Sequence, residues 1–263
     1  MLVDTHCHID VEEFAPDRAA VIARARAAGV AAQVVPAVFA PTWDHLLAVC
    51  RAAPGLYPAL GMHPVYLDVH RPEHLAELRE RVARERPVAI GEIGLDYFVE
   101  GADRGAQQEL FEAQLRIARD HELPVILHVR RAIDPVLATL RRFRVKGGIA
   151  HAFNGSRQQA EQFIGLGFKL GFGGVLTFER AQKIRALARE LPLDALVLET
   201  DAPDLAPAWH KGGRNSPEYL PEILHVLAQL RREPPDLIAS RTTANACAVF
   251  GIPAPSELRD DGT

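Results

Sequence analysis

The feature that most constrains the fold is a regular alternation of short apolar segments and longer segments with helical periodicity. Eight short apolar segments predict β-strands, at residues 3–6, 32–38, 56–61, 88–91, 124–127, 148–150, 168–170 and 195–198. A helix is expected after each strand, with helical segments at residues 17–28, 42–53, 72–85, 107–120, from 134 onward, 156–166, 180–190, 217–230 and 235–250. Because most of the strands are apolar throughout, we expect a parallel sheet buried on both faces.

Eight strand–helix units within 263 residues predict an α/β protein of the (β/α)8 TIM-barrel type. An open, doubly wound sheet is the alternative, because closure of a barrel is not visible in a sequence pattern. No linker or internal repeat interrupts the chain, so we expect one barrel domain at residues 1–252 and a polar C-terminal tail at 253–263.

Composition restricts the setting and the partners. The chain is 48% hydrophobic and 24% charged, which is typical of a soluble globular protein. Apolar runs are too short to span a bilayer, no N-terminal stretch resembles a signal peptide, and the three cysteines have no paired spacing. We therefore expect a cytoplasmic protein with reduced thiols, no membrane contact and no obligate protein partner. The net charge of −4 argues against nucleic-acid binding over the whole surface, so any such contact would need a local basic rim.

Five of the 11 histidines stand at the carboxyl ends of predicted strands: His6, His8, His63, His128 and His151. In a barrel these ends form the mouth, where functional sites are built. Alternation along a strand places His6 and His8 on one face and turns Cys7 to the other. A histidine at a strand end can also be purely structural, but five at one rim indicate a metal site.

Two carboxylates join these histidines at the rim, because Glu92 follows the fourth predicted strand and Asp201 follows the eighth. Six ligands exceed what one ion needs and suit two divalent ions that share a bridging carboxylate. We expect Glu92 to be that bridge. The remaining ligands divide into two sets, with His6, His8 and Asp201 on one ion and His128 and His151 on the other. Ligands rich in histidine favour zinc or manganese over magnesium, although all three remain candidates.

Two cations on one water would lower its pKa and supply a nucleophile for hydrolysis of an ester or amide. Asp201 could act both as a ligand and as the base for that water. His63 is surplus to the six ligands, and we expect it either to contact substrate or protonate the leaving group, or to bond a loop carbonyl. Asp4 and Glu199 lie two residues before ligands, and they either orient ligating imidazoles or fill the barrel with polar side chains.

Basic residues cluster near the predicted rim. Arg130 and Arg131 follow His128, Arg157 follows His151, and a loop after the last strand carries Lys211 and Arg214. Cations beside a two-metal centre suit a phosphate-bearing substrate, so Arg130, Lys211 and Arg214 are candidate substrate contacts. For any one of them alone, a solvated surface position is the competing interpretation.

Together these segments resemble the TatD-type metal-dependent deoxyribonucleases of the amidohydrolase superfamily. The matching segments are Asp4-Thr5-His6-Cys7-His8, Gly61-Met62-His63-Pro64, Gly91-Glu92-Ile93-Gly94-Leu95-Asp96, Leu123-Pro124-Val125-Ile126-Leu127-His128, His151-Ala152-Phe153-Asn154-Gly155-Ser156, Glu199-Thr200-Asp201-Ala202-Pro203, Arg214-Asn215-Ser216-Pro217 and Asn245. The resemblance covers nearly the whole chain. It implies a (β/α)8 fold, two divalent metals at the positions of the six predicted ligands, and a nuclease that acts on DNA, commonly from the 3′ end.

Two positions depart from the family pattern. Val65 stands where many members carry a second histidine. In the motif that follows His151, this chain has Phe153-Asn154 in place of the aromatic-serine version, so Asn154 replaces the serine. Both are expected to face substrate rather than metal. The main hypothesis is therefore a two-metal phosphodiesterase acting on single-stranded or 3′ ends of DNA. The alternatives are a hydrolase of a small amide, lactone or phosphoester, and a metal-stabilised binding protein without turnover.

Overall fold

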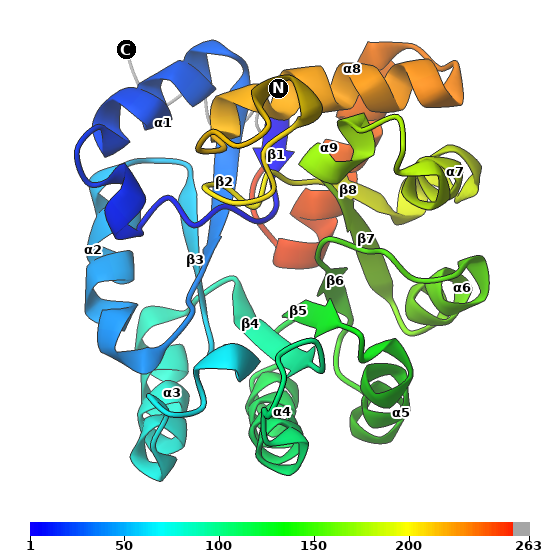
Figure 1. Ribbon diagram of the computed structural model, residues 1–263. Coiled ribbons are helices and arrows are strands. Elements are labelled where there is room, and N and C mark those ends of the chain that lie inside the picture. The colour runs from blue at the N-terminus through cyan, green and yellow to red at the C-terminus, as the bar shows by residue number, and fades with distance from the viewer. Residues whose placement is uncertain (255–263) are drawn as a thin grey trace.

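The computed structural model describes residues 1–254, and its centre is a ring of eight parallel strands (Figure 1). The strands are β1 (Leu2–Asp4), β2 (Val30–Pro36), β3 (Leu56–Leu60), β4 (Ala89–Asp96), β5 (Val125–Arg130), β6 (Gly148–Ala150), β7 (Phe168–Phe172) and β8 (Leu196–Leu198). Each strand pairs in parallel with the next one in the chain. The carboxyl ends of all the strands therefore meet at one face of the ring.

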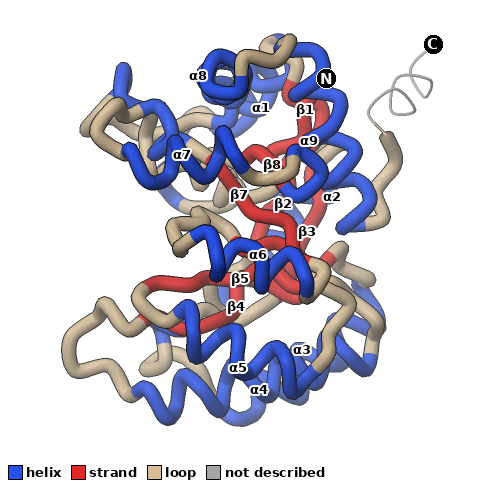
Figure 2. The backbone as a smooth tube through the Cα atoms, turned by 90° about the vertical axis from the view of Figure 1, so that its right-hand side faces the viewer, coloured by secondary structure: helices blue, strands red, loops and turns tan. Residues whose placement is uncertain are grey.

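Helices α1 to α8 surround the strands, and α9 lies behind the ring in the view of Figure 1. Their bounds are α1 (Arg18–Ala27), α2 (Trp43–Ala52), α3 (Pro72–Glu85), α4 (Arg104–Asp120), α5 (Ile133–Phe143), α6 (Arg157–Gly165), α7 (Gln182–Glu190), α8 (Leu220–Arg231) and α9 (Pro235–Phe250). Figure 2 shows the same arrangement from the side, with helices outside the central strands. Proline in the first turn of α3 and α9 fits the fixed φ of that position, and both helices begin at the predicted residue.

The ring is closed between β1 and β8 by hydrogen bonds near their carboxyl ends. The backbone N–H of Thr5 donates to the Leu198 carbonyl at 3.1 Å, and the Asp201 N–H donates to the His6 carbonyl at 2.8 Å. Between them, the Asp4 carboxylate accepts from the Thr200 N–H at 3.0 Å and from the Thr200 hydroxyl at 2.6 Å. The predicted (β/α)8 barrel is confirmed, and the open doubly wound sheet is wrong.

The barrel interior is filled by small and branched apolar side chains that also contact the end of α9. The cluster comprises Val3, Ala32, Val34, Ala59, Ala89, Ile126, Ile149 and Val197 from the strands, and Ala246, Phe250 and Ile252 from the end of α9 and the residues after it. A second, larger cluster packs the strands against the surrounding helices. Because α9 covers one end of the barrel, the opposite end, where the strands terminate, is left to form the mouth.

Three predicted element boundaries are wrong in a way that matters for the site. β1 ends at Asp4, so His6 and His8 follow the strand instead of lying in it. β4 runs on to Asp96 and β5 to Arg130, because their pairing continues through Gly94↔His128 and Asp96↔Arg130. The polar residues Glu92 and His128, which the apolar pattern places at strand ends, therefore lie within strands.

The ends of helices follow local capping. α4 begins three residues earlier than predicted, because the Asp103 side chain accepts from the Ala106 N–H at 3.0 Å. Ser156 caps α6 as predicted and forms a capping box with Gln159. Of the expected tail at 253–263, only the first two residues belong to the part of the chain described. No helix within residues 1–254 is long and apolar enough to cross a membrane.

We predict that Phe250→Ala destabilises the fold by about 3–5 kcal/mol, the usual cost of emptying a buried phenylalanine site. Phe250 is 6% exposed and packs on the barrel interior from α9. Leu237→Ala is the matched control, because Leu237 lies in the same helix and is 42% exposed. Urea unfolding followed by circular dichroism measures both changes. Equal midpoints for the two variants would contradict the closing role assigned to α9.

Candidate metal centre

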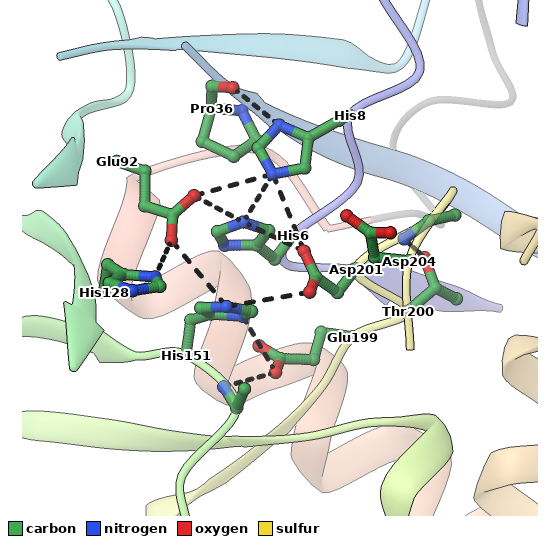
Figure 3. A network of polar contacts seen from close by, with 12 residues as sticks. His6, His8, Pro36, Glu92, His128, His151, Glu199, Thr200, Asp201 and Asp204 are labelled. Atoms are coloured by element: carbon green, nitrogen blue, oxygen red, sulfur yellow. Dashed lines mark hydrogen bonds and ion pairs between the residues drawn. The ribbon is translucent and has the colours of Figure 1, made fainter. Parts of the chain in front are cut away.

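The structure brings the six predicted metal ligands together at the mouth of the barrel (Figure 3). They come from five parts of the chain: the loop after β1 (His6 and His8), β4 (Glu92), β5 (His128), the turn after β6 (His151) and the loop after β8 (Asp201). Imidazoles and carboxylates that lie this close together, and this far from water, need either protons or a cation between them.

The first group of ligand atoms surrounds the nitrogens of His6 and His8. Their Nε2 atoms lie 3.1 Å apart. Glu92 Oε2 lies 3.2 Å from Nε2 of His6 and 3.5 Å from that of His8, and Asp201 Oδ1 lies 3.5 and 3.6 Å from the same two nitrogens. The His8 Nδ1–H donates to the Pro36 carbonyl at 3.1 Å, so the lone pair of neutral His8 is on Nε2 and faces the cluster.

These separations fit a bound divalent ion. Ligand atoms about 2.0–2.2 Å from a tetrahedral ion lie roughly 3.3–3.6 Å from one another. The distances among Nε2 of His6, Nε2 of His8 and Oδ1 of Asp201 are 3.1, 3.5 and 3.6 Å. Their mixture of imidazole and carboxylate suits zinc or manganese. The donor set therefore fits the predicted metal.

The second group lies on the other oxygen of Glu92. Oε1 is 2.9 Å from Nδ1 of His128, 3.5 Å from Nε2 of His63 and 3.8 Å from Nε2 of His151. The two oxygens of Glu92 thus face two different sets of imidazoles, as a bridging carboxylate would. His151 stacks on His6 at 3.8 Å between ring centroids but lies 6.4 Å from His128. The ring of His63 lies 4.2 Å from that of His128, so it is nearer to His128 than the predicted partner His151.

Two further carboxylates contact ring nitrogens of the candidate ligands His151 and His128. Glu199 Oε1 lies 3.2 Å from Nδ1 of His151 and accepts from the Ala152 N–H at 2.6 Å, in the orienting position that we expected. Asp96 Oδ2 lies 2.9 Å from Nε2 of His128. Sequence reasoning missed Asp96 because it ended the strand at Gly91; a strand continued past Glu92 would have placed both acids on one face.

Asp4 differs from the expectation that it would contact an imidazole. Its carboxylate instead accepts from the backbone N–H of His6 at 3.2 Å and from Thr200. It therefore positions the segment that carries the ligand rather than the ring itself. Cys7, as predicted, is buried in the apolar cluster between strands and helices.

A missing side chain makes room for Glu199. A Cβ on Gly171 of β7 would lie 2.1 Å from Glu199 Oε2, closer than any real contact allows. Gly173 is similarly close to the backbone of Glu199, where a Cβ would lie 2.9 Å from the carbonyl oxygen. Gly171 and Gly173 thus create the space in which the Glu199 carboxylate reaches His151.

The surroundings shift the pKa values of the clustered groups in opposite directions. Burial opposes the charge on His151, but Glu199 and Asp201 outweigh it and raise its pKa to about 10. Burial raises the pKa of Asp201 to about 6, although the charges on His151 and His8 oppose the rise. Burial would also raise the pKa of Glu92, yet the surrounding imidazoles hold it well below the ordinary value. Glu92 is therefore an anion, and a metal ion competes with protons for the imidazoles.

His63 is oriented as a proton donor. Its Nδ1 accepts from the Val65 N–H at 3.2 Å, so the neutral ring carries its proton on Nε2, which faces Glu92. Burial lowers the pKa of His63, which keeps the ring neutral. A nitrogen that carries a proton cannot at the same time ligate a metal ion. In this tautomer His63 is not a ligand, although its ring lies with Glu92 and His128 in a group whose atoms are close enough together to hold an ion.

The predicted basic contacts are not equivalent. Arg130 lines the cavities at the mouth together with His128 and Asp201. Arg214 instead binds Asp17 through two hydrogen bonds of 2.8 and 2.7 Å and also donates to the Glu13 carbonyl. Lys211 is exposed in the loop after β8. Arg214 thus ties this loop to the start of α1, and Arg130 is the basic candidate closest to the ligands.

Two cavities adjoin the ligand cluster. One of about 370 Å³ is lined by five of the six candidate ligands, all but His6, and by Val65, one of the two departures from the family pattern. Another of about 440 Å³ extends past His151 and Asp201 over the apolar side chains of Phe153, Phe172 and Leu176, and Asn154, the second departure, lines it. Both departures therefore face the space open to a substrate.

Comparison with known proteins extends these observations. The model of the family described as TatD related DNase matches residues 3–251. The uncharacterized metal-dependent hydrolase YjjV of Escherichia coli K12 is 42% identical over 254 residues, covering 95% of this chain and 98% of that protein. The 3′-5′ ssDNA/RNA exonuclease TatD of Cronobacter sakazakii is 37% identical over 257 residues, covering 95% of this chain and 97% of the relative.

Solved structures agree with this similarity. The crystal structure of YjjV, described as a TatD homologue, superposes with a TM-score of 0.93 at 42% identity and covers 96% of this chain and 98% of its own. A TatD family hydrolase from Entamoeba histolytica superposes with a TM-score of 0.84 at 16% identity, covering 95% of this chain and 97% of its own. At that identity the likeness concerns the fold alone.

We predict that Gly171→Ala weakens metal binding by about 10–100-fold, the usual effect of disturbing a group that orients a ligand. The new Cβ must displace Glu199 and so release His151. Gly165→Ala in α6 is the matched control, because its Cβ would meet nothing within 4 Å. Calorimetric titration with zinc and manganese measures the affinities. Equal affinities in both variants would exclude the orienting role of Glu199.

Proposed function

Because the chain belongs to the family of TatD-related DNases, we propose that it hydrolyses phosphodiester bonds of DNA and removes nucleotides from the 3′ ends of single strands. The observation that carries this proposal is the cluster at the mouth, where Glu92 presents one oxygen to each of two sets of imidazoles. A relative 37% identical to the chain is named a 3′-5′ ssDNA/RNA exonuclease. The chain is thus a metal-dependent hydrolase of ester bonds, which sets aside a binding protein without turnover.

The proposed cofactor is a pair of divalent ions. His6, His8 and Asp201 would hold one of them, His128 and His151 would contribute to the other, and Glu92 would contact both. When bound, such ions lower the pKa of a water and stabilise negative charge on a phosphate. Zinc and manganese suit the imidazole-rich ligands better than magnesium.

Three side chains around this centre have separate roles in the proposed reaction. Asp201 presents one carboxylate oxygen to His6 and His8 and the other to His151, so it could hold an ion and also accept the proton of the attacking water. His63 directs its Nε2–H toward the centre and can donate a hydrogen bond to the departing oxygen, which receives its proton from water. Arg130, on the wall of both cavities, can pair with a phosphate oxygen.

A second candidate substrate is a small phosphoester, amide or lactone. The cavity of about 440 Å³, with Phe153, Phe172 and Leu176 in its wall, could enclose a compact apolar group. The two candidates differ in their response to salt. Binding through several phosphates weakens steeply as the salt concentration rises, whereas binding of a small neutral substrate does not.

We predict metal-dependent release of nucleotides from single-stranded DNA, and a loss of about 10²–10⁴-fold in kcat for Asp201→Asn, since the amide cannot accept the proton. The assay supplies manganese, magnesium or zinc to protein stripped with a chelator. Oligonucleotides labelled at the 5′ end should give a ladder, and those labelled at the 3′ end should release labelled mononucleotide at once.

Asp236→Asn is the control for this assay, because Asp236 is exposed at the start of α9. Cleavage that persists without metal, or that Asp201→Asn leaves intact, would refute the proposed mechanism. Hydrolysis of small esters without cleavage of any DNA would favour the second candidate substrate.

A further inference from the structure

Exposed apolar side chains gather in the loops at the mouth of the barrel. Among the described residues they include Val65 and Tyr66 after β3, Phe98 and Val99 after β4, and Leu205 and Trp209 after β8. Exposed aromatic side chains beside a functional site are typical of surfaces that receive a ligand. Phe98, which is 45% exposed, is the one with the most specific surroundings.

Two arginines from the end of β5 lie on the ring of Phe98. The guanidinium carbon of Arg130 is 3.6 Å from the ring centroid, and that of Arg131 is 4.6 Å away. Both contacts are within the range of cation–π attraction. The ring therefore holds two like charges side by side, in a protein whose net charge is −4.

Among the described residues, neither guanidinium has a protein acceptor. Within residues 1–254, Arg130 and Arg131 form no side-chain hydrogen bond or ion pair, whereas the nearby Arg157 pairs with Glu161 and Arg214 pairs with Asp17. Two adjacent forks of N–H donors are thus held in position and left available to an anion.

The pair is coupled to the metal centre by short bonds. Asp96 accepts from the Phe98 N–H at 2.8 Å through one oxygen and contacts His128 at 2.9 Å through the other. The Tyr97 N–H donates to the Arg130 carbonyl at 2.8 Å. The loop that carries Phe98 is therefore fixed relative to the candidate ligands, which is a condition for binding two parts of one substrate.

A third cavity, of about 480 Å³, opens in front of this pair. Its wall includes Phe98, Arg130, Arg131 and Lys183, and its one acidic member, Asp134, is engaged by Gln159 at 2.8 Å. Lys183 contacts the carbonyl of Asn154, so it reaches the same space. Arg130 lines this cavity and both cavities at the ligand cluster, which places all three side by side.

We propose that Phe98, Arg130, Arg131 and Lys183 form a binding subsite for a second phosphate of single-stranded nucleic acid, one nucleotide or more away from the phosphate at the metal centre. This proposal rests on the proposed function. It adds a contact with the nucleic acid beyond the bond that is cleaved. Two guanidiniums can bind one phosphate through paired hydrogen bonds. The part of the Phe98 ring that the guanidiniums leave exposed suits contact with the adjacent base, since such contact tolerates any sequence.

The first test compares a short oligothymidylate with bis(p-nitrophenyl) phosphate, which has only the phosphate that is cleaved. In Arg131→Gln and Phe98→Ala, the ratio of kcat/KM for the oligonucleotide to that for the small ester should fall about tenfold. Arg180→Gln is the matched control, because Arg180 is also exposed and lies 5.6 Å from the ring of Phe178, outside these three cavities. Its ratio should equal that of the wild type.

The second test measures binding without turnover, by fluorescence anisotropy of labelled oligothymidylate in EDTA. Arg131→Gln should weaken binding and reduce the slope of log K against log salt by about 1, as expected for one lost phosphate contact. Equal affinity and slope in Arg131→Gln and Arg180→Gln, or no binding by the wild type, would overturn the subsite. Wild-type protein that binds the oligonucleotide but cleaves none would instead refute the proposed nuclease activity and leave the subsite standing.

Discussion

The placement of the candidate metal ligands depends on the buried carboxylate of Asp4. It accepts from the Thr200 N–H and hydroxyl and from the backbone N–H of His6, so it joins the two ends of the barrel sheet. His6 and Asp201 follow directly on either side of this joint. Burial raises the pKa of Asp4 to about 7, against the hydrogen bonds that favour its charge. The protein thus buries a carboxyl group, at a cost in free energy, at the point where the barrel closes and the candidate ligands are positioned.

Three of the candidate ligands are each contacted by a group from another part of the chain. Pro36 of β2 fixes His8, Glu199 fixes His151, and Asp96 faces His128. Rings restrained in this way keep their lone pairs directed inward, which lowers the entropy lost on metal binding. The absence of a side chain at Gly171 belongs to the same arrangement, since any larger residue would displace Glu199.

The sequence was sufficient to predict the barrel and the meeting of the six ligands, because strand ends in a barrel share one rim. The sequence was insufficient to place the end of a strand that continues through a polar residue. The apolar pattern ends at Glu92 and His128, whereas the strands continue past both, and Asp96 lies in the continuation of β4. Arg214 illustrates a different limit. Its partner Asp17 lies 197 positions away, and a pattern confined to one loop contains no information about such a pair.

The joint between β1 and β8 has a consequence for the order of events during synthesis. Asp4 and Thr200 are separated by 196 positions, and α9, which covers the far end of the barrel, comes later still. Contacts this distant form late and make folding slow. While the chain is still emerging from the ribosome, the histidines near its start have no partner for the ion they will share. The cluster of candidate ligands is therefore complete only when nearly the whole polypeptide has been made, because Asp201 follows the last strand of the barrel.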